Sequence, residues 1–77
     1  MKLNDIIEVI WIDIVAESAW LSEESASNFQ PCYVKNIGYF INQDDKCLRL
    51  SSSRQIKDKE RDVTVIPNGV IKKISVI

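Results

Sequence analysis

The stretch YVKNIGYFIN, residues 33–42, decides the fold class of this chain. Its larger apolar side chains alternate between two faces, with Tyr33, Ile37, Tyr39 and Ile41 on one face and Val34, Gly38 and Phe40 on the other. A period of two predicts a long β-strand. Gly38 inside that strand predicts a bend or a bulge, because a strand interior loses side-chain packing at glycine.

The residues that follow complete a β-hairpin. QDDK, residues 43–46, is a polar turn in which aspartate is favoured, because its side chain bonds the nearby backbone. CLRLSS, residues 47–52, then returns as a second strand. A turn centred on Asp44 and Asp45 places Cys47 opposite Asn42 and leaves Cys32 far down the ladder.

Three further strands flank the hairpin. Residues 7–14, IEVIWIDI, are rich in β-branched side chains and carry apolar residues on both faces. Residues 63–66, VTVI, precede a tight turn at 67–69, PNG, and residues 70–77, VIKKISVI, close the chain. The last segment also fits a helical spacing, but its valine and isoleucine content favours a strand.

The segment between the first two strands loses the alternation. Ser22 precedes Glu23 and Glu24, which is the pattern of a helix N-cap followed by an acidic first turn. Pro31 cannot continue a helix and ends the excursion. We therefore expect one or two helical turns between residues 22 and 30.

Five strands with a short helical excursion after the first predict an all-β fold, a small five-stranded barrel of SH3-like or Sm-like type. Residues 1–77 make a single domain. A chain this short buries only about 60% of the surface that it exposes when unfolded, so we expect marginal stability and a homo-oligomer. One barrel interior hides one face of each strand, so some apolar residues should lie outside, against the excursion or another chain: Ile7, Val9, Trp11, Ile71 or Ile77.

Charge is distributed unevenly along the chain. The net charge is −1, yet residues 1–31 hold one basic and six acidic residues, whereas residues 32–77 hold nine basic and five acidic residues. An acidic first half and a basic second half would present a two-signed surface to partners. The alternative is that the charges are simply solvated strand and loop faces.

Several function classes are disfavoured by composition. The chain has no histidine, and its two cysteines, Cys32 and Cys47, lack metal-ligand spacing, so we expect no metal, no cofactor and reduced thiols in a cytosolic protein. The commonest general base is missing, and the paired Asp44 and Asp45 are explained by their turn, so we expect no enzyme. No leader peptide or apolar run of membrane length is present, which indicates the cytoplasm and no membrane partner.

The candidate binding residues are aromatic and basic: Trp20, Tyr39, Arg49, Arg54 and Lys57. Trp20 lies on the irregular segment, where it is either a core residue or an exposed anchor for a partner, because tryptophan is enriched at interface hot spots. The basic residues from Arg49 to Arg61 are interleaved with acids and lack neighbouring aromatics, which makes nucleic acid an unlikely partner and favours a solvated loop.

The overall pattern of aromatic, glycine and proline positions resembles small uncharacterised proteins encoded by bacteriophages and prophages. The resemblance rests on V-x-W-x-D at residues 9–13, on Trp20, on IGY at residues 37–39 and on IPNG at residues 66–69. It implies a phage setting and an SH3-like barrel. The closing residues 66–71 also look like the last motif of Sm proteins, except that Pro67 and Asn68 stand where that motif has an arginine.

Three functional hypotheses follow. The leading one is a non-enzymatic phage accessory protein that binds a host component in the bacterial cytoplasm, either a host protein or a small nucleotide ligand, for instance to counter host defence. The second is a nucleotide-sequestering protein in which Arg49, Arg54 or Lys57 holds phosphates and an aromatic ring stacks on the base. The third is an Sm-like RNA-binding protein, whose affinity should fall steeply with salt.

Overall fold

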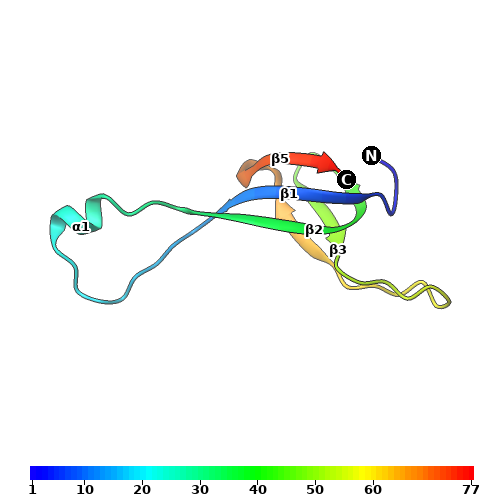
Figure 1. Ribbon diagram of the computed structural model, residues 1–77, viewed down its shortest axis with the longest axis horizontal. Coiled ribbons are helices and arrows are strands. Elements are labelled where there is room, and N and C mark those ends of the chain that lie inside the picture. The colour runs from blue at the N-terminus through cyan, green and yellow to red at the C-terminus, as the bar shows by residue number, and fades with distance from the viewer.

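A computed structural model describes residues 1–77 as a mainly β domain (Figure 1). Its elements are β1 (Ile6–Asp13), α1 (Glu23–Ser27), β2 (Cys32–Gln43), β3 (Cys47–Ser51), β4 (Thr64–Pro67), the 3-10 helix η1 (Asn68–Val70) and β5 (Ile71–Val76). Every expected strand is present, and each end lies within one residue of its expected position. The all-β fold class and the short helix after the first strand are therefore confirmed. No helix is long and apolar enough to span a bilayer.

The five strands form a single antiparallel sheet in the order β4-β3-β2-β1-β5. β4 and β5 lie at opposite edges of this sheet, although only η1 separates them in the chain. So short a connection spans about 15 Å at most, so the sheet has to curl to bring its two edges toward each other. The expected closure into a barrel is nevertheless wrong. The two edge strands form no β4–β5 ladder, so the sheet stays open.

The core occupies one face of the curled sheet. It consists of six buried side chains from four strands: Ile7, Val9, Phe40, Leu48, Leu50 and Ile66. Side chains from β1, η1 and β5 pack against this cluster, among them Trp11 and Ile74. Ile7 and Val9 are completely buried, so the apolar residues left outside on β1 are those of its other face.

Trp11 is partly buried on the core side of β1. Its ring packs against the core cluster, and its Nε1 donates a hydrogen bond of 2.8 Å to Oδ1 of Asn36. A buried indole usually needs such a partner. Asp13 accepts a hydrogen bond from the backbone amide of Ile14, at 2.8 Å, and none from an indole.

The register of the β2–β3 hairpin differs from the expected one. Asn42 lies opposite Arg49, not Cys47. Phe40 pairs with Leu50, which already differs from the expected register by one residue, and the ladder shifts by one more residue between Phe40 and Asn42. Cys47 instead lies opposite Pro67 of β4. Both cysteines are free: Cys47 is buried, and Cys32 is exposed at the start of β2.

Gly38 permits a close backbone approach. A Cβ atom at this position would collide with the backbone carbonyl oxygen of Ser51 on β3 and would press on the side chain of Leu50. The irregularity of β2 lies further along, between Phe40 and Asn42, so the bulge expected at Gly38 is displaced toward the turn.

Residues 14–31 form a projecting arm that joins β1 to β2 and carries α1 (Figure 1). Every residue of the arm is exposed, and its loop and side-chain hydrogen bonds stay within the arm or go to the adjacent Asp13. A second projection, the distal hairpin of residues 52–63, extends away from the arm between β3 and β4. These two projections explain why the molecule measures 54 × 22 × 21 Å.

The arm leaves the second face of β1 and β2 uncovered. On this outer face Ile6 lies opposite Tyr39, Ile12 opposite Tyr33, and Ile37 opposite Glu8. Ile37 and Tyr33 are more than half exposed. One ion pair crosses the face, with the Lys35 ammonium 3.6 Å from the Glu8 carboxylate. The outer face is thus a mixed surface of aliphatic and aromatic side chains around a single ion pair.

Candidate binding surfaces

The tip of the arm presents the most exposed aromatic side chain of the protein. Trp20 has a relative exposure of 102%, and its indole has no hydrogen-bond partner. Leu21 and Phe29, on the same arm, are 40% and 48% exposed. Of the two interpretations of Trp20, the exposed one is therefore the one that the structure shows.

The structure of the arm is held locally. Ser22 caps α1, because its Oγ accepts a hydrogen bond of 3.1 Å from the amide of Ser25. At the other end of α1, Asn28 and Ser27 donate to the carbonyl oxygen of Glu24. The capping predicted from Ser22 and the following glutamates is confirmed, and it holds one helical turn beside Trp20 without any contribution from the sheet.

Tyr39 and Arg54, both candidate residues, lie together. The Arg54 guanidinium carbon is 5.3 Å from the centroid of the Tyr39 ring, which is cation–π geometry. Tyr39 belongs to β2, and Arg54 stands near the base of the distal hairpin. The pair joins the hairpin to the outer face of the sheet.

Arg49 does not share a contact with Arg54, and its guanidinium group already binds two side chains of the β2–β3 hairpin. Its Nη1 is 3.0 Å from Oδ2 of Asp44 and donates a hydrogen bond of 2.9 Å to Oδ1 of Asn42. The bond to Asp44 raises the pKa of the Arg49 guanidinium. Of the residues proposed to hold phosphates, Arg49 therefore already has a carboxylate partner within the protein.

Asp44 organises the turn between β2 and β3. Its Oδ1 accepts hydrogen bonds from the amides of Cys47 and Lys46, at 2.9 and 2.8 Å. These bonds, with the Arg49 side chain, lower the pKa of Asp44 from 3.8 to about 2. The predicted turn role of this carboxylate is confirmed.

Lys57 lies near the tip of the distal hairpin, where it is exposed and forms no ion pair. Lys59 is close to it in sequence and has a positive φ of 57°, a conformation suited to a tight turn. Lys57 does not line the pocket at the base of the hairpin.

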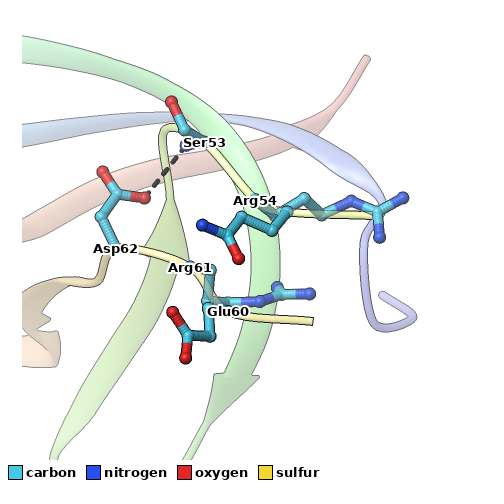
Figure 2. Close-up of a pocket in the computed structure, with 6 residues that line it drawn as sticks. Ser53, Arg54, Glu60, Arg61 and Asp62 are labelled. Carbon is cyan, nitrogen blue, oxygen red and sulfur yellow. Dashed lines mark hydrogen bonds between the residues drawn. The ribbon is translucent and has the colours of Figure 1, made fainter. Parts of the chain in front are cut away.

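An open pocket of about 330 Å³ lies on the distal hairpin (Figure 2). Six polar or charged residues line it: Ser53, Arg54, Gln55, Glu60, Arg61 and Asp62. Arg54 and Arg61 are directly paired across the hairpin by an isolated antiparallel bridge. Two arginines from opposite strands of the hairpin therefore line one pocket.

Arg61 was not among the predicted site residues. Its Nη2 donates a hydrogen bond of 2.8 Å to Oδ1 of Asn4, while its Nη1 is buried and has no hydrogen-bond partner. The sequence does carry a signal for this pairing, because residues 52–63 continue two strands that already form a hairpin. Counting inward from Ser52 and Val63 places Arg54 opposite Arg61.

Asp62 holds the base of the distal hairpin closed. Its carboxylate accepts hydrogen bonds from the amides of Ser52 and Ser53, at 2.9 and 3.0 Å, and from the hydroxyl of Ser52. These bonds, the one from the Ser52 hydroxyl above all, lower the pKa of Asp62. The carboxylate is thus committed to the hairpin itself.

Comparison with known proteins identifies no match: no family model, no curated protein and no solved structure is similar to this chain.

Proposed function

We propose that this chain is a non-enzymatic phage accessory protein that binds a host protein in the bacterial cytoplasm through its projecting arm. The observation that carries the proposal is the complete exposure of Trp20 on a segment whose one hydrogen bond to the sheet is donated by Ile14 to the adjacent Asp13. The phage setting is supported by the resemblance of residues 9–13, 37–39 and 66–69 to small phage proteins.

The energetics of Trp20 favour a partner. Burial of a tryptophan side chain removes about 200 Å² from water, which at about 25 cal/mol per Å² is worth about 5 kcal/mol before the cost of ordering. Within the monomer this free energy is not realised, because the arm contacts no core residue. A partner with an apolar pocket would gain it.

The negative charge of the arm indicates what kind of surface a partner should have. Residues 14–31 contain Glu17, Glu23 and Glu24 and no basic residue. An acidic, aromatic tip is complementary to an apolar pocket with a basic rim, since opposite surface potentials steer association. The same charge disfavours nucleic acid as the ligand of the arm.

Site-specific photocrosslinking in bacterial cells tests the proposal. A photoreactive phenylalanine analogue is placed at position 21, next to Trp20, where Leu21 is 40% exposed, and a control protein carries it at position 56, where Ile56 is 84% exposed on the distal hairpin. We expect one host protein to crosslink from position 21 only, and its recovery by affinity purification to be lost in Trp20→Ala but kept in Ile56→Ala.

Recovery of the same host protein with Trp20→Ala as with the unsubstituted chain would contradict the proposal. A ribonuclease-sensitive adduct in place of a protein would favour the Sm-like RNA-binding alternative.

A further inference from the structure

We infer that Arg54 and Arg61 form a binding site for the phosphate group of a small phosphate-bearing ligand. The site lies on the distal hairpin, away from the arm, and does not depend on the proposed function (Figure 1). Neither the exposure of Trp20 nor the charge of the arm enters the argument.

The first observation is the pairing of two like charges. Arg54 and Arg61 lie directly opposite each other in the bridge of the distal hairpin. Like charges in such cross-strand positions repel each other and destabilise the pairing. Neither arginine forms an ion pair, since the two salt bridges of the molecule are Glu8–Lys35 and Asp44–Arg49. A shared anion would remove the repulsion.

The second observation is an unused donor of Arg61. Its Nη1 is buried and has no hydrogen-bond partner, although its neighbour Nη2 is engaged by Asn4. A buried polar group without a partner is costly, and most such groups in proteins are satisfied. Because this atom is closed to solvent, an oxyanion in the pocket would become its acceptor once the Arg61 side chain turns toward the ligand.

The third observation is the chemistry of the pocket. None of its six lining residues is apolar, and the side-chain donors of Ser53 and Gln55 form no hydrogen bond within the protein. With the two guanidinium groups, they make a donor-rich site. Arginine is the residue that matches phosphate oxygens best, because its planar fork donates two parallel hydrogen bonds.

Two carboxylates also line the pocket, and their placement reduces their effect on an anion. Asp62 is engaged by Ser52 and Ser53. Figure 2 shows the guanidinium groups of Arg54 and Arg61 both extending to the right of the view, while the carboxylate of Glu60 points away from them, to the lower left. Adjacent residues of an extended chain point to opposite faces, so Glu60 and Arg61 are separated by the backbone.

Arg54 is held beside Tyr39. Its guanidinium carbon lies over that ring, 5.3 Å from the centroid, and this contact uses no hydrogen-bond donor of the guanidinium. The same ring is occupied by Arg54, so we assign recognition to the phosphate and not to stacking of a base on Tyr39.

Nuclear magnetic resonance titration of the ¹⁵N-labelled full chain tests the inference. The probes are inorganic phosphate, adenosine monophosphate and adenosine, all at constant ionic strength. We expect saturable shifts of the backbone amides of residues 53–62 and of the arginine Nε–H groups with both phosphate-bearing probes and none with adenosine. Arg54→Gln, which removes no hydrogen bond, should weaken binding at least about tenfold, the loss of one charge-assisted contact.

Lys57→Gln is the matched control, since it removes one positive charge from the same hairpin but not from the pocket. It should change the affinity less than about threefold, because an exposed charge outside the site is screened. Arg61→Lys keeps the charge and loses the fork, and it should also weaken binding.

Three results would overturn the inference: no saturation up to about 20 mM phosphate, where even a weak millimolar site would be filled; equal losses in Arg54→Gln and Lys57→Gln; or adenosine binding as tightly as adenosine monophosphate.

Discussion

Gly38 is a position at which the fold has no room for a side chain. The backbone carbonyl of Ser51 lies where a Cβ atom would stand, and backbone cannot move aside as the end of a flexible side chain can. The neighbouring Leu50 belongs to the core, so a shift of β3 would also disturb buried packing.

Gly38→Ala should therefore destabilise the protein by about 1 to 3 kcal/mol, the usual cost of inserting an extra carbon into a packed interior. Gly69→Ala is its control, because a Cβ atom at Gly69 meets nothing within 4 Å and its φ is not positive. That substitution should be neutral or slightly stabilising. Urea unfolding measures both, and equal midpoints for the two variants would show that β3 can yield.

Asp44 makes the stability of the turn depend on pH. Its folded pKa, about 2, lies below its ordinary value of 3.8, so its charged form stabilises the folded state. The contribution is complete above the unfolded pKa and disappears as pH falls through the folded pKa.

Asp44→Asn keeps an acceptor for the amides of Lys46 and Cys47 but removes the charge. The variant should unfold at lower urea than the unsubstituted protein near neutral pH, and the difference should shrink between about pH 4 and pH 2. Thermal or urea unfolding across this range decides the matter. A difference that stays constant down to pH 2 would assign the effect of Asp44 to something other than its charge.

Among the elements, the arm and the sheet are independent. The ladder between β1 and β2 ends at the pair Asp13 and Cys32, and no core residue comes from residues 14–31. The helix α1 has five residues, too few to be stable from propensity alone, and it rests on the caps at Ser22 and Asn28. The arm should therefore fray while the sheet stays folded.

Replacing residues 14–31 with Asn-Gly should leave the sheet intact, because this dipeptide favours the tight turn that joins paired antiparallel strands. The melting temperature should change by less than about 4 °C or rise, since about 1 kcal/mol shifts a domain of this size by that amount and a shorter loop costs less entropy. Circular dichroism measures it. A large loss of stability would mean that the arm contributes to the core.

At the scale of the whole molecule, the outer face of β1 and β2 is a largely apolar surface that the arm leaves uncovered. We expect from the sequence that some apolar strand residues lie outside the core. Ile77, which is 68% exposed, meets this expectation, whereas Ile7 and Val9 are buried in the core. The arm was one possible cover and does not reach the face. A second copy of the chain would be another, and a two-fold dimer is the commonest closed arrangement.

We therefore expect concentration-dependent dimerisation through the outer face. Ile37→Lys should weaken the dimer on the order of tenfold, because it removes an apolar contact and adds a charge at the interface. The new lysine lies opposite Glu8, so the monomer should still fold. Ile56→Lys, on the distal hairpin, should leave the dimer unchanged. Sedimentation equilibrium over a wide concentration range tests this, and a single species at the monomer mass would contradict it.

The strands and the turns were predictable from the sequence because their causes are local. β-branched residues alternating with a period of two define a strand wherever it ends up, and Asp44, Pro67 and Ser22 act on backbone within a few residues. These signals located every strand to within one residue and placed the cap of α1.

The tertiary structure alone decided which face of β1 is buried, that the sheet stays open, that Trp20 stands free, and that the Arg54 guanidinium lies over the Tyr39 ring. Each depends on register or curvature between segments distant in the chain. Both faces of β1 are apolar, so alternation could not say which one faces the core. The β2–β3 ladder likewise pairs Asn42 with Arg49, two residues from the expected partner, and one of these two residues comes from the register shift between Phe40 and Asn42. Such a shift arises from how two strands pack against each other, and no local pattern encodes it.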